Sequence, residues 1–293
     1  MATKLWLGND VGNEGDLSVA ANWSPVGVPV NGDDVMFYDS DQAVSGGLNQ
    51  SAVTPGSIRI YHNYTGLFGL GDTPVQWGGC PVYIGEHWGA GNPVGSARIN
   101  LDLGSGSAAT IEVFNGCLNS EDGDVPPIRL LTAHASSVLR VRKGRVGVAS
   151  GVGQTAQLSK IVVGYAANRQ SDADVVIGSG VTLATLDVTG GRCVLLCAAT
   201  TVNVSDGQLR AEGSGAIATV NADGGRLRLN SSGTITTLNL GPADVDLLGS
   251  EAARTITTIN PSAGGSLALD KNVVTITNKL GFAEPLKITF ARP

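Results

Sequence analysis

The sequence predicts an all-β fold, a single-stranded parallel β-helix (a solenoid) with about 18 residues per coil. A phrase of Thr, a branched apolar residue, and Asp or Asn recurs between Leu183 and Ile276. A small-residue corner and a second short alternating run follow each copy. Such a period is typical of stacked repeats that bury their apolar faces only against their neighbours. The five full copies begin at Thr185, Thr201, Thr219, Thr237 and Thr258.

The spacing of the copies bears on the handedness of the helix. The interval from Leu238 to Ile259 is longer than the interval from Leu186 to Val202, so the period is not strict. A left-handed helix would have sides of about six residues, and the sequence lacks a regular repeat of that length. We therefore predict a right-handed helix.

Two sets of side chains are expected to stack along this helix. Repeated Thr and Asn side chains are expected to form ladders. The apolar anchors of the phrase are expected to stack in the interior, namely Leu186, Val202, Val220, Leu238 and Ile259.

The composition limits which classes of protein the chain can belong to. Glycine provides 41 of the 293 residues, while only 15% are charged and 5% aromatic, which suits tightly turned β-structure better than helices or disorder. No run approaches the roughly 18 apolar residues of a membrane span, and no secretory leader is recognisable. The net charge of −6 argues against a nucleic-acid groove. We expect a soluble protein made in the cytoplasm, with neither membrane nor nucleic acid as a partner.

The chain divides into four segments by pattern. The first is expected to cover the open end of the solenoid, where apolar core and strand edges would otherwise be exposed. Within it, residues 16–23 are expected to form a short helix with Asp16 as its N-cap. The predicted segments are 1–41 (N-terminal cap), 42–96 (irregular, aromatic-rich first coils or a lobe), 97–280 (regular β-solenoid) and 281–293 (C-terminal cap or tail).

Acidic residues are candidates for catalytic pairs, because β-helices host polysaccharide-cleaving enzymes that use two carboxylates. Each cluster lies in a stretch rich in Gly, Ser or Asn, where solvated turn residues are the ordinary explanation. Residues 119–124 carry oxygen ligands suited to calcium but lack the EF-hand spacing. We predict no catalytic residue, metal or cofactor. The clusters are Asp39 with Asp41, Glu121 with Asp122 and Asp124, and Asp172 with Asp174.

Histidines and cysteines carry no motif. The three histidines, His62, His87 and His134, are dispersed, and none has a sequence neighbour at a metal-binding spacing. No nucleophile elbow, Walker loop or dinucleotide fingerprint is present. The cysteines lack Cys-x-x-Cys pairs and are expected to be buried, reduced thiols that pack as small apolar groups. They are Cys80, Cys117, Cys193 and Cys197.

The only basic cluster runs from Arg140 to Arg145 and alternates with apolar residues. This alternation predicts one outward strand face, and contact with an acidic partner surface is the alternative.

Aromatic residues are concentrated near the start, since all four tryptophans precede residue 90. Tryptophan is favoured at the centres of protein contacts, so we predict that this third of the chain binds a partner. Alternatively, the same side chains plug the end of the solenoid. The predicted partner-binding residues are Tyr61, Tyr64, Phe68, Trp77 and Trp88.

Several phrases carry a family resemblance that covers nearly the whole chain. Residues 5–9 (LWLGN), 21–25 (ANWSP) and 28–35 (VPVNGDDV) resemble the N-terminal module of a group of phage and prophage structural proteins. In that group, phrases like 64–66 (YTG) and 130–135 (LLTAHA) precede glycine-rich β-repeats, and no catalytic residue can be transferred from it. The opening is also similar to passenger-domain repeats of bacterial autotransporters, but the chain lacks their signal peptide and C-terminal barrel strands.

The resemblance implies a non-enzymatic virion structural protein, a capsid decoration or cement protein on the capsid surface. Its expected partner is the major capsid protein or another virion protein, and a homotrimer would suit a threefold site on a shell. A tail fibre or tailspike that binds host surface glycan is the first alternative, although its aromatic residues would be expected along the shaft. A bacterial surface adhesin is the second, and it would need an export route.

Overall fold

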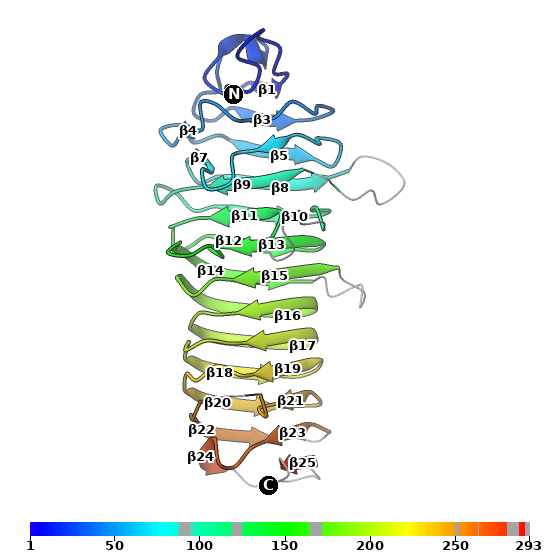
Figure 1. Cartoon of the computed structure of the whole chain (residues 1–293), viewed down its shortest axis with the longest axis vertical. Coiled ribbons are helices and arrows are strands. Elements are labelled where there is room, and N and C mark those ends of the chain that lie inside the picture. Colours follow the sequence, from blue (N-terminus) through cyan, green and yellow to red (C-terminus); the bar gives the residue numbers. More distant parts are fainter. Residues whose placement is uncertain are drawn as a thin grey trace. The chain divides into compact units, whose positions relative to one another are not determined.

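The computed structural model is all-β, with 52% of the chain in strands and 1% in helix. Its strands pair mostly in parallel, which is compatible with the predicted solenoid. Contacts divide the chain into two compact units, 1–149 with 156–158 and 150–155 with 159–293. The colours of Figure 1 follow the sequence, so the residues of each unit can be located there. The structure describes residues 1–87, 95, 97–118, 125–164, 172–249, 252–262, 264–279 and 287–290.

Parallel ladders build the first unit. One ladder contains β1, β3, β5, β8, β10 and β12, and the other contains β4, β7, β9, β11 and β13, with β6 also beside β9. From β8 to β13 the chain alternates between the ladders. The strands are β1 (Thr3–Trp6), β2 (Trp23–Ser24), β3 (Asp34–Phe37), β4 (Asn49–Gln50), β5 (Ser57–Tyr61), β6 (Leu67–Phe68), β7 (Val75–Trp77), β8 (Pro81–Glu86), β9 (Arg98–Asp102), β10 (Thr110–Val113), β11 (Ile128–Leu131), β12 (Val138–Val141) and β13 (Gly144–Val148).

The register of the first unit differs from the predicted period. Val82 pairs with Ile111, and Ile111 pairs with Leu139. All three side chains are buried. Both intervals are much longer than those between the predicted anchors of the second half of the chain. The predicted period therefore does not extend to these strands, because longer connections separate successive members of a ladder.

The helix expected over residues 16–23 is replaced by turns and one 3₁₀ turn, η1 (Ala20–Asn22), which has no side-chain cap. The Oδ1 atom of Asp16 accepts hydrogen bonds from the backbone N and the Oγ of Ser18, at 2.8 and 2.6 Å. Asp16 thus closes a turn, a common role for this residue, and does not begin a helix. The buried Asn22 fixes the same loop, because its Oδ1 accepts from the Asp10 backbone N at 2.7 Å.

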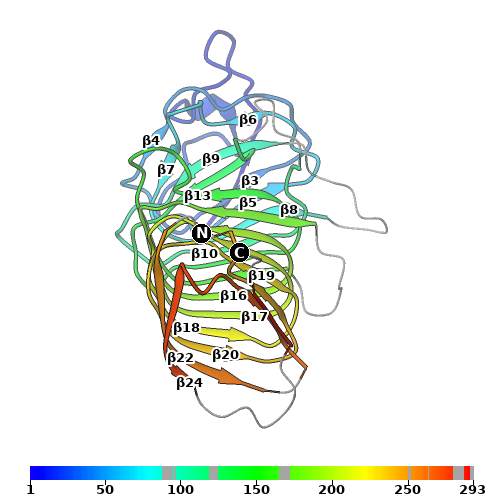
Figure 2. The same ribbon diagram turned by 60° about the horizontal axis from the view of Figure 1, so that its bottom comes forward.

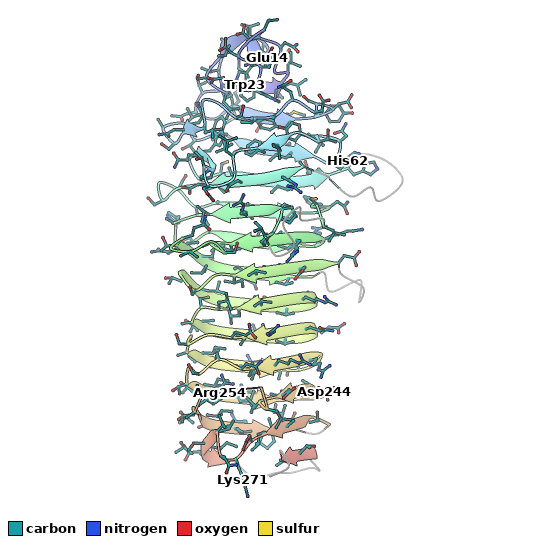
Figure 3. All side chains as sticks on the ribbon, viewed as in Figure 1. Glu14, Trp23, His62, Asp244, Arg254 and Lys271 are labelled. Carbon is teal, nitrogen blue, oxygen red and sulfur yellow. The ribbon has the colours of Figure 1, made fainter. Side chains whose placement is uncertain are left out.

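Aromatic side chains fill the first part of this unit. The Trp6 and Trp23 rings meet edge to face with centroids 5.1 Å apart, and Phe37 lies 6.0 Å from both. Both indoles are fully buried, and the Nε1 of Trp23, which is labelled in Figure 3, donates to the Leu17 carbonyl oxygen at 2.9 Å. Buried aromatic rings contribute large apolar areas, so this cluster anchors β1, β2 and β3 to one another.

The second unit also consists of parallel ladders (Figure 2). One contains β16, β17, β18, β20, β22 and β24, and the other contains β15, β16, β17, β19, β21, β23 and β25, because the long β16 and β17 reach both. The strand β14 (Ala156–Val163) enters this unit at residue 159. The others are β15 (Ala173–Ile177), β16 (Val181–Leu195), β17 (Ala199–Ala211), β18 (Ile217–Ala222), β19 (Arg226–Leu229), β20 (Ile235–Leu240), β21 (Asp244–Asp246), β22 (Arg254–Pro261), β23 (Ser266–Leu269), β24 (Val274–Lys279) and β25 (Lys287–Phe290).

The predicted anchors stack in register in this unit. They pair successively across β16, β17, β18, β20 and β22, and none is more than 3% exposed. The sequence-based prediction of one interior stack is therefore confirmed. The anchors are Leu186, Val202, Val220, Leu238 and Ile259.

Next to each anchor, a polar side chain extends a hydrogen-bonded ladder. Each asparagine Nδ2 donates to the Oδ1 of the residue one strand earlier, at distances of 2.7, 2.7, 2.6 and 2.7 Å. All of the amides point the same way along the stack, since each amide group is a donor at one atom and an acceptor at the other. The ladder contains Asp187, Asn203, Asn221, Asn239 and Asn260.

The glycine residues at the corners of successive repeats also lie against one another. Gly207 and Gly225 both have positive φ, of 78° and 70°. A Cβ atom added to Gly225 would lie 2.6 Å from the Gly207 carbonyl oxygen. Conformation and space therefore both require glycine at this corner.

We expect Gly225→Ala to destabilise the second unit more than Gly213→Ala. Gly213 has a similar φ of 75°, but a Cβ there would meet only the Leu196 carbonyl oxygen, at 3.3 Å. The comparison therefore separates crowding from backbone conformation. Overpacking typically costs about 1–3 kcal/mol, so urea unfolding should give that difference between the two variants. Equal losses would mean that the corner can relax around a methyl group.

Candidate binding surface

Four of the five predicted partner-binding residues are buried. Tyr61 is 4% exposed and Trp77 1%, while Tyr64 and Phe68 are not exposed at all. Trp88 lies outside the described residues. Side chains without solvent exposure cannot touch a partner of the folded chain. The interpretation of these four residues as a contact surface is therefore corrected, and their burial favours the alternative in which they fill the interior.

The contacts of Tyr64 illustrate this interior role. Its ring lies 5.5 Å from that of Phe37, and Phe37 also meets Phe68 at 4.9 Å. The Tyr64 hydroxyl donates to the Gln42 carbonyl oxygen at 2.9 Å. Burial raises the pKa of Tyr64 above its ordinary value, because the phenolate would lose its hydration.

Other aromatic residues of the first unit do reach the surface. Tyr83 faces outward from β8, and Phe114 directly follows β10. The two rings are stacked with centroids 6.5 Å apart and an angle of 22° between their planes. The Arg59 guanidinium lies 4.5 Å from the Tyr83 ring centroid, and that of Arg142 lies 4.6 Å from the Phe114 centroid. We call these four residues the arginine–aromatic array.

The parallel register creates the array. Arg59 pairs with Tyr83, so the two side chains share the outward face of neighbouring strands. The strand β10 joins the same ladder, since its Glu112 pairs with Tyr83. Neighbouring strands lie about 4.8 Å apart, a spacing that suits stacked planar groups. Sequence reasoning missed Tyr83 and Phe114, and the available signal was the alternation of outward and buried residues around each.

Ion pairs surround the array. Arg59 contacts the Glu86 carboxylate at 2.6 Å, and Glu112 contacts both Arg140 and Arg142 at 3.4 Å. All five side chains are partly exposed, so each pair contributes little to stability. Among the described residues, three guanidinium groups meet two carboxylates at this surface. The structure also divides the basic cluster between β12 and β13, so the predicted single strand face is corrected.

The packing of the rings limits which ligands the array can bind. A sugar stacks on a free aromatic face, but each of these rings has an arginine on one side and its neighbouring ring on the other. The two arginine side chains of the array are partly exposed. Such groups suit acidic side chains on a protein surface better than a glycan platform.

An open groove of about 400 Å³ lies on the second unit. Its outward residues are small and uncharged, for example Thr182, Ala198, Ala216 and Thr234. Small Thr and Ala side chains at equivalent positions of successive strands account for its shape, and they supply no acid, base or nucleophile.

The three acidic clusters predicted as candidates do not form a catalytic or metal site among the described residues. Glu121, Asp122 and Asp124 lie outside the described residues. Asp39 occupies a turn with a φ of 48°, and Asp174 belongs to β15. Among the side chains that the structure describes, no three His, Cys, Asp or Glu groups gather as metal ligands.

The histidine prediction changes in one respect. His62 and His87 are distant in the chain, yet their Nδ1 atoms lie 3.4 Å apart. His134 is elsewhere, and its Nδ1 accepts a hydrogen bond from the Ser136 backbone N at 3.2 Å. Their spacing in the sequence gave no sign of this contact, which the fold creates between the first two histidines.

All four cysteines are free and buried, as the sequence predicted. Burial raises the pKa of both Cys80 and Cys197 to about 12, because a thiolate would lose its hydration in the interior. The pKa of Cys193 is raised for the same reason. Protonated thiols are poor nucleophiles, so these three side chains serve packing.

Comparisons with protein-family models, curated proteins and solved structures find no match. Within the described ranges, no helix has the length and apolar character of a membrane span.

Proposed function

We propose that the chain is a non-enzymatic virion structural protein, a capsid decoration or cement protein that binds and stabilises a phage shell. The observation that carries the structural role is the register of the second unit, where buried anchors and a continuous asparagine ladder repeat from strand to strand. Such a scaffold is rigid because every repeat is fixed by its neighbours. The assignment to a virion rests on the resemblance of the N-terminal phrases.

The proposed architecture is a right-handed, single-stranded β-helix. Alternation of the chain between parallel ladders supports the helix, since each return to a ladder adds one coil. The antiparallel pairing of β2 with β1, next to the buried Trp6 and Trp23, supports a cap in residues 1–41. The strand β25 pairs in parallel with β23 and supports a C-terminal segment that extends the ladder.

The partner we propose is the major capsid protein or another virion protein with an acidic surface, bound at the outside of the shell after synthesis in the host cytoplasm. The arginine–aromatic array supports this choice, because its guanidinium groups are partly exposed beside stacked rings. A homotrimer on a threefold site would present three arrays at once. The covered ring faces disfavour a tailspike that stacks host glycan on these residues.

Cosedimentation with capsids that lack the chain tests this function. We expect saturable binding by the unmodified protein, and binding weaker by about tenfold or more after the double change Arg59→Ala and Arg142→Ala. Arg228→Ala is the matched control, because this arginine is also partly exposed and lies 3.9 Å from a carboxylate, on the second unit. Electron microscopy of labelled virions should place the protein on the head.

Three outcomes would overturn the proposal. They are failure to bind capsids, label confined to the tail, and release of oligosaccharide from host glycan by the purified protein. Equal loss of capsid binding in the array variant and in Arg228→Ala would reject the array as the contact.

A further inference from the structure

The two histidines of the first unit face each other because of a β-bulge. Along the paired strands β5 and β8, Ile60 lies opposite Ile84, but the next residue, Tyr61, lies opposite Glu86. The residue skipped by this register shift is Gly85, with a φ of 74°. Without the shift, residue 62 would lie opposite Glu86. The bulge instead brings His62, which is labelled in Figure 3, next to His87.

The bulge depends on glycine at position 85. A Cβ atom on Gly85 would lie 2.4 Å from the Asn115 carbonyl oxygen, so no other residue fits there without a shift. Bulges are frequent where a strand must re-aim a side chain. Here the side chain that it re-aims is His87.

The imidazole rings are incompletely satisfied by hydrogen bonds. Their planes are perpendicular, with centroids 4.4 Å apart, and the two Nδ1 atoms are 3.4 Å apart. A neutral imidazole carries one N–H, so each ring has one donor nitrogen and one acceptor nitrogen. The Nε2 atom of His87 is buried and has no partner among the described residues. A proton on that Nε2 leaves the lone pair of His87 Nδ1 directed toward His62.

The distance between the nitrogens matches a shared metal ion. Two imidazole nitrogens bound at roughly 2.05 Å to one tetrahedral ion lie about 3.4 Å apart. This equals the distance found between the Nδ1 atoms. We propose that His62 and His87 form a binding site for a single divalent transition-metal cation of the Zn²⁺ class, bound through the two Nδ1 atoms.

The neighbouring groups determine which cations the pair can take. The Glu86 carboxylate contacts Arg59 at 2.6 Å and would have to leave this ion pair to act as a ligand. The Glu86 carbonyl oxygen lies 3.1 Å from the His62 Nδ1 and accepts a hydrogen bond from it when no metal is present. Metal binding requires the other tautomer, in which the proton of His62 is carried by Nε2. Imidazole suits Zn²⁺, Cu²⁺ and Ni²⁺, whereas Ca²⁺ and Mg²⁺ require several oxygen ligands. Water would complete the coordination, which makes this an open site.

Binding requires a small rotation of the rings. In a tetrahedral pair, centroids about 5 Å apart let both lone pairs meet at the ion, which is wider than the 4.4 Å found here. Rotation of each ring about its terminal side-chain torsion provides this change, because that torsion is broad in histidine.

Calorimetric titration of the full, untagged chain with ZnCl₂ tests the site. We expect saturable binding of one Zn²⁺ per chain and no comparable binding of Ca²⁺ or Mg²⁺. His62→Gln and His87→Gln should each weaken Zn²⁺ binding by about tenfold or more, since each removes one of two ligands. His134→Gln is the matched control and should leave binding unchanged, because the chain has three histidines and this one lies elsewhere.

A second measurement separates loss of the site from loss of the fold. Proton–carbon spectra of the three imidazoles should show two of them shifting on addition of Zn²⁺. The double variant, His62→Gln with His87→Gln, should retain the tryptophan fluorescence melt of the unmodified protein while losing Zn²⁺ binding. Absence of saturable binding, retained binding in the folded double variant, or equal weakening by His134→Gln would each overturn the proposal.

Discussion

Val220→Asp is expected to unfold much of the second unit, whereas Asn221→Asp should leave it folded with a smaller loss. Val220 is fully buried between Val202 and Leu238 in the anchor stack. An unpaired carboxylate there would lose its hydration without gaining a hydrogen bond, which costs several kcal/mol. The cavity left by the removed methyl groups adds to this loss.

The adjacent substitution is milder because Asn221 is only half-buried. An aspartate there would still accept the hydrogen bond from the Asn239 Nδ2, found at 2.6 Å, but would no longer donate to the Asn203 Oδ1. Loss of one such donor costs about 1–3 kcal/mol. Side chains alternate between the interior and the surface along one strand, so substitutions at these two neighbouring residues should differ greatly in their effect on stability.

The measurement must report on the second unit. All four tryptophans precede residue 90, so fluorescence is blind to it, and far-UV circular dichroism or calorimetry is needed. Ala218→Asp is the control for an added charge, because Ala218 is exposed on the same strand, β18. Comparable unfolding midpoints for Val220→Asp and Asn221→Asp would contradict the alternation on which the register depends.

The recurring phrase was sufficient to predict the register of the second unit. Thr201 and Thr219, for example, start successive copies of the phrase and pair directly in the structure. Similar local patterns at a similar spacing favour similar environments, because each repeat meets a near copy of itself. The polar ladder follows from the same logic, since Asn203 and Asn221 are placed side by side whenever Val202 and Val220 stack.

The burial of Arg254 could not be predicted from the recurring phrase. It is 2% exposed, its Nη2 donates to Ser231 Oγ at 2.8 Å, and its Nη1 donates to the Leu229 carbonyl oxygen. Burial lowers the pKa of Arg254, which is labelled in Figure 3, to about 10. The available signal was the alignment of residues 254–260 (RTITTIN) with 233–239 (GTITTLN), which puts the arginine at a glycine position. An isolated arginine is ordinarily assigned to the surface, because arginine is almost never fully buried unless it is paired.

The surface of the first unit could not be predicted because its spacing is irregular. The rings of Tyr83 and Phe114 stack although they are distant in the sequence, and His62 meets His87 only through a bulge. Neither contact follows from the period of the recurring phrase. Long connections and single-residue insertions change which side chains meet, and no pattern within one strand encodes them.

The first third of the chain is rich in aromatic residues because these side chains fill its interior, not because they form a contact surface. Trp77→Ala should lower the stability of the first unit by about 3–5 kcal/mol, the usual cost of truncating a buried tryptophan. The side chain is 1% exposed. Its Nε1 has no acceptor among the described residues, so Trp77→Phe, which removes this unpaired donor, should cost much less.

Thermal unfolding followed by the fluorescence of the remaining tryptophans distinguishes packing from contact. Leu67→Ala is the matched control, because Leu67 is apolar and 50% exposed in the same unit, and its truncation should change the midpoint little. If Trp77 instead contacts a partner, Trp77→Ala will keep the midpoint and weaken capsid binding. The structure predicts the opposite: the folded fraction of Trp77→Ala should bind as tightly as the unmodified protein, because the arginine–aromatic array on the outer face is unchanged.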